Sequence, residues 1–279
     1  MKTIIKLILL TFSAAAFFSC TETIELDLYQ ASPRVVVDGL ITNADTDHYI
    51  RLTTSVGFYE QGKAPGISGA EVEVTDSEGN VFAFTEKETE PGLYTSRFAG
   101  KVGNTYNLRV SLPDGSERWA SDRMEPVMPI DRLEWQVDED EQEDPAEEGF
   151  FYRILIFGEE PMATKDYYLF KFYRNDTIQN FDPGTGIFIA DDSMIGGYIN
   201  GLESPEYYRA GDEARFEMYR ISRNAYLFYN DLSNILNGDG GMTSPSPVNP
   251  RSNVFSSAGV ELGLFQVSAV NKTSITVGA

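Results

Sequence analysis

The stretch that decides the fold runs from Ile67 to Thr85 and reads ISGAEVEVTDSEGNVFAFT. Apolar and polar side chains alternate along Ile67–Asp76, and a period of two is typical of a strand with one buried face. The turn-forming group Ser77–Asn80 follows, after which Val81–Thr85 resumes an extended, β-branched and aromatic pattern. The stretch therefore predicts two consecutive strands joined by a tight turn.

Comparable segments recur on both sides of this stretch, with turn residues such as Pro113–Gly115 between them. Short strands spaced by roughly 8–12 residues are typical of a β-sandwich. The sequence therefore predicts a mainly β fold, with residues 20–32 as an anchor and first strand and a sandwich domain over residues 33–125. The other predicted strands of this domain are Arg34–Thr42, Tyr49–Ser55, Leu93–Phe98, Thr105–Leu112 and Glu117–Ser121.

The second half of the chain, residues 126–279, is predicted as a β-rich C-terminal domain with one helix. Along residues 223–236 (RNAYLFYNDLSNIL) the apolar side chains return at helical spacing instead of alternating. Ser222 can serve as the N-cap of this helix, and Asn237-Gly238 can end it.

Aromatic side chains are concentrated in this second half. Eight of them crowd two neighbouring predicted strands, where they favour a core role but leave a binding surface open. Three further tyrosines, Tyr198, Tyr207 and Tyr208, lie in predicted loops among Gly, Pro and Asn and are the candidate ligand-binding residues. The eight strand aromatics are Phe150, Phe151, Tyr152, Tyr167, Tyr168, Phe170, Phe172 and Tyr173.

An acidic run, DEDEQEDPAEE, occupies residues 138–148. It lacks the central glycine and the spacing of an EF-hand calcium loop. We interpret it as the solvated tip of a hairpin between Leu133–Val137 and Phe150–Phe157, and whether it binds a cation stays open.

The N-terminus has the features of a secretory signal. Lys2 and Lys6 precede the uncharged run Leu7–Ser19, which is shorter than the ~20 residues that a membrane-spanning helix needs. The run ends in AAAFFSC at Cys20, the single cysteine of the chain. The sequence predicts a lipoprotein signal peptide over residues 1–19 and lipidation of Cys20, with an ordinary signal peptide and an incidental cysteine as the alternative.

Composition excludes several classes of function. The formal net charge of −21 opposes binding to nucleic acid, which requires a basic surface. A hydrophobic content of 42% is enough for a substantial core. The sequence does not indicate the oligomeric state.

Catalytic constellations are not evident. His48, the single histidine, lies in a predicted turn and has no Gly-x-Ser-x-Gly motif to serve as a base. One cysteine and one histidine cannot build a Cys/His zinc site. A glycosidase needs only two carboxylates, but nothing in the sequence singles out a pair. We therefore expect no enzymatic activity, no cofactor and no metal.

Several landmarks together resemble the Bacteroidetes lipoprotein family called domain of unknown function 4249 (DUF4249), over nearly the whole chain after Cys20. Residues 69–80 with 92–96 and 103–110 also resemble carboxypeptidase-regulatory-like and transthyretin-like sandwiches, which implies an Ig-like or transthyretin-like N-terminal sandwich without catalytic chemistry. The landmarks are AAAFFSC with TETIELDL at 21–28, RVVVDGLIT at 34–42, YIRLTTS at 49–55, ISGAEVEVTDSEGN at 67–80, PGLYTS at 91–96, GNTYNLRVSLPDG at 103–115 and NPRSNVFSSAGVELGLFQVSA at 249–269.

Members of the family are associated with TonB-dependent outer-membrane receptors. The resemblance implies a non-enzymatic outer-membrane lipoprotein, anchored through Cys20, that assists such a receptor in ligand uptake. The anchor would face the periplasm or the cell surface, with the surface favoured. The alternatives are a structural or adhesive cell-surface lipoprotein and, less favoured, a secreted hydrolase.

Overall fold

A computed structural model describes most of the chain after the predicted signal and anchor. The fold is mainly β, as the sequence predicts. The residues from Pro33 onward form one compact unit. Cys20 and the predicted first strand at 20–32, apart from Ser32, lie outside the described residues. The described ranges are 32–57, 62–143, 148–159, 164–179, 186–238 and 248–278.

Two layers of strands enclose the first core. One layer contains β1, β2 and β5 together with the first half of β17, and the other contains β3, β4, β6, β7, β15 and β16. The alternation of the sequence explains the packing, because Val72 and Val74 point into the core while Glu71 and Glu73 are exposed. The bounds are β1 Val35–Thr42, β2 Thr46–Thr54, β3 Glu71–Asp76, β4 Val81–Glu86, β5 Leu93–Phe98, β6 Thr105–Ser111, β7 Glu117–Arg123, β15 Val254–Ser256, β16 Gly259–Val260 and β17 Leu262–Thr276.

A second core lies between β10, β12 and β14, which extend the sheet beyond β17, and a three-stranded sheet. The aromatic β10 and β14 supply Tyr168, Phe170 and Phe216 to this core, and the three-stranded sheet supplies Ile156 and Ile199. The strands beside β17 are β10 (Tyr167–Arg174), β11 (Thr177–Ile178), β12 (Phe188–Asp191) and β14 (Glu213–Arg220), and the three-stranded sheet contains β8 (Arg132–Val137), β9 (Tyr152–Glu159) and β13 (Tyr198–Glu203).

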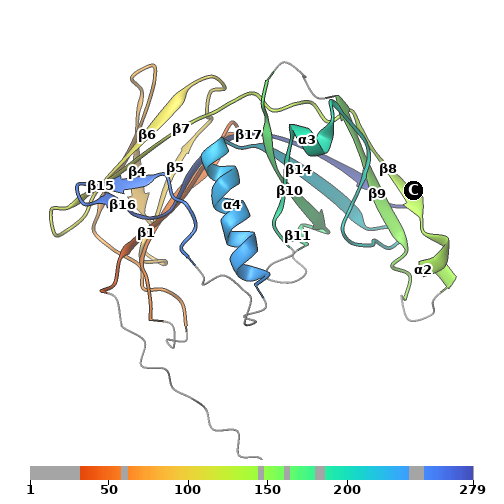
Figure 1. Ribbon diagram of the computed structural model, residues 1–279, viewed down its shortest axis with the longest axis horizontal. Helices are drawn as coiled ribbons and strands as arrows, with labels where there is room; N and C mark the ends of the chain where they lie inside the picture. The colour runs from red at the N-terminus through yellow and green to blue at the C-terminus, as the bar shows by residue number, and fades with distance from the viewer. Residues whose placement is uncertain are drawn as a thin grey trace, which may run out of the picture. The chain divides into compact units, whose positions relative to one another are not determined.

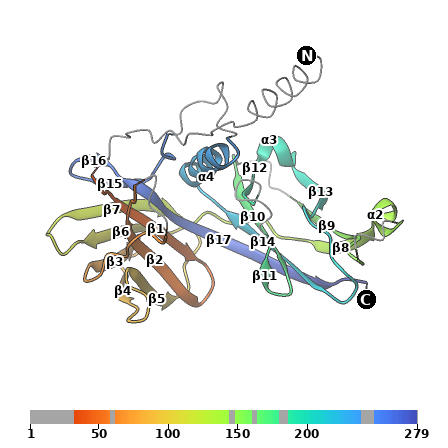
Figure 2. The same ribbon diagram turned by 90° about the horizontal axis from the view of Figure 1, so that it is seen from below.

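Strand β17 pairs with strands from both halves of the chain. Its first half, Leu262–Ser268, pairs parallel with β1, and its second half, Ala269–Thr276, pairs antiparallel with β14. Figure 2 shows this strand as one long blue arrow that passes from β1 to the C-terminus. The sequence predicts a boundary between two domains near residue 126. Strands β15 and β17 come after that boundary in the chain but pair with β7 and β1, which come before it.

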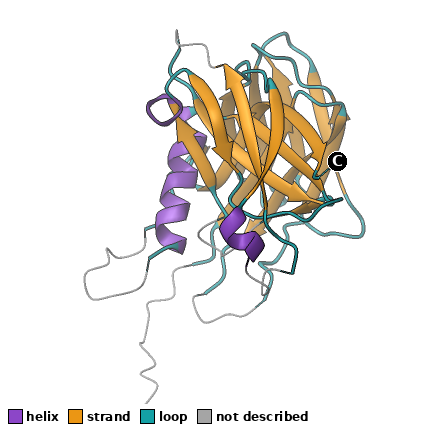
Figure 3. Ribbon diagram, turned by 90° about the vertical axis from the view of Figure 1, so that its right-hand side faces the viewer, coloured by secondary structure: helices purple, strands orange, loops and turns teal. Residues whose placement is uncertain are grey.

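Helix α4 (Arg223–Leu236) has the bounds that the sequence predicts. The Ser222 hydroxyl accepts a hydrogen bond from the amide of Ala225 at 3.3 Å, which caps the N-terminus. The helix packs on the sheet face that points away from the two cores, through Ala225 against Leu264 and Tyr219 (Figures 1 and 3). Two short helices, α2 (Glu139–Glu143) and α3 (Asp192–Ile195), were not predicted.

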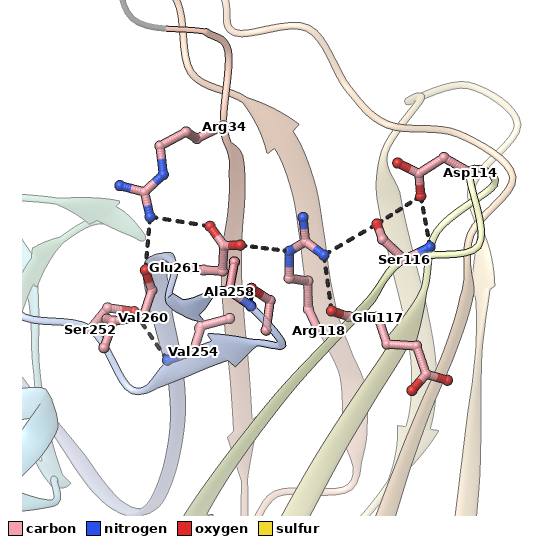
Figure 4. A network of polar contacts seen from close by, with 11 residues as sticks. Arg34, Asp114, Ser116, Glu117, Arg118, Ser252, Val254, Ala258, Val260 and Glu261 are labelled. Carbon is pink, nitrogen blue, oxygen red and sulfur yellow. Dashed lines mark hydrogen bonds and ion pairs between the residues drawn. The ribbon is translucent and has the colours of Figure 1, made fainter.

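A partly buried carboxylate joins the start of β1 to the start of β17 (Figure 4). Glu261 contacts Arg34 Nη2 through Oε2 at 3.2 Å and Arg118 Nε through Oε1 at 3.3 Å. Arg34 Nη2 also donates to the carbonyl of Val260 at 2.8 Å. Burial opposes the charge of Glu261, but the hydrogen bonds from Ser256 and Arg34 and the charge of Arg118 outweigh it, so its pKa lies below the ordinary value.

Replacement of Gly263 tests the contact between β1 and β17. Gly263 has a φ of +109°, and a Cβ there would lie 1.8 Å from the carbonyl oxygen of Val37. We expect Gly263→Ala to lower the free energy of unfolding by more than about 4 kcal/mol, measured by urea denaturation. Gly259 is the matched control, because it has a φ of +119° but no atom within 4 Å of such a Cβ. Gly259→Ala should cost about 1–3 kcal/mol from backbone strain alone, and equal losses would refute the contact argument.

Replacement of Glu261 tests this partly buried carboxylate. Because its folded pKa is lowered, its charge stabilises the fold above the ordinary value of 4.5, and this stabilisation is lost as the pH falls below that value. We expect Glu261→Gln to reduce the free energy of unfolding by about 1–3 kcal/mol at neutral pH and to flatten its decline on acidification. Glu117→Gln, in an exposed pair with Arg109, should cost less than about 1 kcal/mol. An unchanged acid slope in Glu261→Gln would contradict the assignment.

Candidate functional site

An apolar groove opens between β12, α3 and β13. Its volume is about 530 Å³, within the range of ligand-binding clefts. Met194, Tyr198 and Leu202 at the groove are exposed by 70%, 42% and 37%. Phe170 and Ile199 also line it and connect it to the second core. The groove therefore presents apolar side chains to solvent on a framework of packed strands.

Local sequence explains the shape of this groove. The side chain of Asp191 accepts a hydrogen bond from the amide of Ser193 at 3.1 Å and starts the single turn of α3. Gly196 ends that turn in a left-handed conformation with a φ of 69°. An irregularity between Asn200 and Leu202 then bends β13 against β9.

Tyr198, one of the three candidate tyrosines, lines the groove. Its predicted loop position is wrong, because it is the first residue of β13 and lies opposite Glu159 on β9. The guanidinium of Arg132, from β8, interacts with the Tyr198 hydroxyl and contacts Glu134 through Nε at 2.6 Å. The ring of Tyr198 therefore lies between apolar and charged surroundings, which is a common position for a contact residue.

Tyr207 belongs to a separate polar cluster. Its hydroxyl donates to Asp138 Oδ2 at 2.9 Å and accepts from Arg153 Nε at 3.0 Å. Arg153 also contacts Glu203. Asp138, Arg153 and Glu203 border a cavity of about 270 Å³. The hydrogen bond from Tyr207 is the main cause that lowers the pKa of Asp138. Sequence reasoning missed the partners of Tyr207 because Asp138, directly after β8, and Arg153, on β9, are distant from it in the chain.

Tyr208 is a core residue. It is 1% exposed and packs with Ile154, Ala214 and Val277. Its backbone bridges to Tyr152, with the Tyr208 amide donating to the Tyr152 carbonyl at 2.8 Å. The structure therefore places the three candidate tyrosines in three different surroundings and does not bring them together.

A polar cleft that the sequence did not suggest lies beside α4. It has a volume of about 350 Å³, and Tyr49, Glu217, Tyr219 and Lys272 are among its lining residues. The Tyr219 hydroxyl donates to Glu217 Oε2 at 2.7 Å. Next to Glu217 in the sheet register, Lys171 places its ammonium 4.6 Å from the centre of the Tyr219 ring.

The charges at this cleft perturb one another. Burial lowers the pKa of Lys171, whereas the negative charges of Glu217 and Asp38 act in the opposite direction. Asp38 reaches solvent, yet desolvation by the surrounding residues raises its pKa, partly offset by Arg51 and by the Tyr49 hydroxyl. Among the described residues no ion pair within 4 Å includes Lys171, so a half-buried cation lies beside the cleft, where the charges of Glu217 and Asp38 act on it.

His48 does not lie in a solvated turn as predicted. It is part of β2 and 2% exposed, with Nε2 2.9 Å from the carbonyl oxygen of Phe98. The amide of Thr42 donates to Nδ1 at 3.4 Å. Burial lowers the pKa of His48, so the ring is neutral at physiological pH and has a structural role in this position.

The remaining predictions about candidate residues have mixed outcomes. Tyr167, Tyr168, Phe170 and Phe172 are each at most 8% exposed, so their core role is confirmed. The acidic run does connect β8 and β9, which pair antiparallel, and its first part forms α2.

No group of acidic, histidine or cysteine side chains that could hold a metal occurs in the described ranges. Within those same ranges, no helix is both long and apolar enough to cross a bilayer.

Comparison with known proteins gives one family. The sequence model of the domain of unknown function DUF4249 matches residues 21–274. The chain belongs to this family. The match confirms the predicted family, and the family description assigns no activity. No curated protein matches the chain.

Two solved structures are similar to this DUF4249 protein at low TM-scores. A DUF4785 family protein from Legionella pneumophila is 8% identical with a TM-score of 0.25, and the match covers 67% of this chain and 52% of that one. The adhesin InvE of Yersinia pseudotuberculosis is 12% identical with a TM-score of 0.21, and the match covers 88% and 59%. The chain thus spans little more than half the length of either. Such TM-scores are too low to bear on fold or function.

The influence of Glu217 on the pKa of Lys171 can be tested by mutation. We expect Glu217→Gln to lower the pKa of Lys171 further, because the variant removes the negative charge with the larger influence in favour of the ammonium. Amine labelling as a function of pH, with peptide mass spectrometry, measures this pKa. Glu213→Gln on the same strand β14 is the control and should leave it unchanged. A Lys171 pKa unaffected by Glu217→Gln would show that the two charges do not interact.

Proposed function

We propose that this DUF4249 protein is a non-enzymatic outer-membrane lipoprotein that assists a TonB-dependent receptor in the uptake of a ligand. The observation that carries the proposal is the apolar groove at α3 and β13. An exposed apolar surface of this kind is unfavourable unless a ligand or partner covers it. Lipid on Cys20 would keep the groove at the membrane, on the cell-surface side in preference to the periplasmic side.

The chemistry of the groove suits contact without catalysis. Met194 has a flexible, polarisable side chain that adapts to different surfaces. Tyr198 adds a large ring with a polar end, a residue type that is enriched where proteins bind partners. Asn200 supplies one of the few polar groups, which can orient an apolar ligand or a partner side chain.

Two charge-introducing variants test the proposal. We expect Met194→Asp and Tyr198→Asp to abolish the recovery of a TonB-dependent barrel with the tagged protein from native outer membranes in mild detergent. An aspartate in the groove must lose its hydration when a partner covers it. Mass spectrometry of the captured proteins measures the barrel. Val102→Asp is the control, because Val102 is 43% exposed in a turn away from the groove.

The possible results separate the hypotheses. A parent protein that captures no barrel at matched expression would overturn the proposal and favour a structural or adhesive role. Barrel capture that persists in both variants, together with lost uptake, would place the ligand and not the barrel in the groove. Turnover of glycans or peptides by the purified protein would instead support a hydrolase. A Cys20→Ala protein that is released from the membrane but leaves uptake unchanged would also contradict the proposal.

A further inference from the structure

Three apolar side chains lie in one row across β7, β15 and β16. Trp119 pairs with Phe255, and Phe255 pairs with Val260. Their exposed fractions are 44%, 40% and 57%. Cross-strand neighbours lie close together on one face of a sheet. We call these three residues the edge patch.

The edge patch differs from the rest of its row. Across the sheet, the neighbour of Trp119 on β6 is Arg109, and the neighbour of Arg109 on β3 is Glu73. Both are exposed and charged. The row is therefore polar in the middle of the sheet and apolar at the edge, where the strand order ends with β16.

The backbone of this edge is not suited to pairing with another strand. β16 contains only Gly259 and Val260, and short edge strands resist strand addition. Figure 4 shows that the carbonyl of Val260 is occupied by Arg34, whose Nη2 donates to it at 2.8 Å. The amide of Glu261 donates inward to the carbonyl of Val254 at 2.9 Å. A partner of the edge patch therefore contacts side chains and not main-chain groups.

The edge patch lies next to the point where the N-terminal segment enters the fold. Arg34 is held there by Val260 and Glu261. Thirteen residues separate Cys20 from Arg34, so a lipid on Cys20 would be attached no more than about 50 Å from Arg34 along the chain. Such an anchor would keep the edge patch within reach of the bilayer surface.

We propose that the edge patch contacts the lipid interface of the membrane that holds the anchor and thereby orients the protein on it. The occupant is the boundary between headgroups and acyl chains. Tryptophan favours that boundary because its ring is apolar and its N–H is polar. Phe255 and Val260 add apolar surface beside it, and Arg109 can remain among the headgroups. The proposal rests on the anchored state of the proposed function but not on the barrel or the groove.

Depth-dependent quenching of Trp119 tests this contact. The full lipidated protein, with Trp135→Phe so that Trp119 is the single tryptophan, is reconstituted into vesicles of phosphatidylethanolamine and phosphatidylglycerol that carry brominated acyl chains. We expect the lipid to quench Trp119 fluorescence and to shift its emission to shorter wavelength. Phe255→Ser with Val260→Ser should remove most of the quenching. Val81→Ser is the matched control, because Val81 is 58% exposed on β4 at the far side of the same layer.

The outcomes separate this contact from the anchor. The mass of the intact protein and of its Cys20→Ser variant shows whether lipid is attached, and a chain without lipid would overturn the anchor and this contact together. A lipidated chain whose Trp119 stays accessible to iodide in water and unquenched by lipid would overturn the contact alone. Protection of Trp119 only when a barrel is added would assign the edge patch to a protein partner and also overturn the lipid contact. Equal effects of Val81→Ser and of the double variant would mean that general loss of apolar surface, not this patch, is responsible.

Discussion

The pairing of β17 with β1 and β14 is the constraint on which the rest of the structure depends. One unbroken strand supplies Phe265 and Val267 to the first core and Ile275 to the packing near the C-terminus. Its other face carries Leu264 and Gln266, on which α4 rests, with the Tyr229 hydroxyl donating to Gln266 Oε1 at 2.7 Å. The polar cleft lies on that same face, so the cleft and the helix both depend on the correct register of β17.

Register is fixed by local details at the start of this strand. Gly263 allows β1 to approach, and Glu261 holds Arg34 and Arg118 immediately before it. A slip of one residue would turn the side chains of Phe265 and Val267 to the opposite face. The carboxylate of Glu261 and the glycine therefore specify one alignment, while the apolar side chains on either side provide most of the stabilisation.

Sequence reasoning succeeded where the signal was local. Alternation identified the strands of residues 33–125, and the cap at Ser222 fixed the start of α4. It failed where distant segments decide the outcome. His48 was predicted in a turn, but it lies in a strand and its ring contacts the Phe98 carbonyl on β5 and the Thr42 amide. Tyr198 was predicted in a loop, but it lies in a strand that pairs with β9. The polar cleft could not be predicted because its walls come from segments far apart in the chain. The groove is built mostly from the single stretch 187–202, but the shape of that stretch depends on the pairing of β12 with β10 and of β13 with β9.

The separation of β1 and β17 along the chain has a consequence for folding during synthesis. The paired residues Val36 and Leu262 lie 226 positions apart, so this hydrogen-bonding edge of β1 stays unpaired until β17 has been made. Contacts between residues so distant in sequence form slowly, and an open strand edge favours aggregation meanwhile. A chain that lacks β17 would leave β1 and β14 without their common neighbour, so neither half of the fold would be complete.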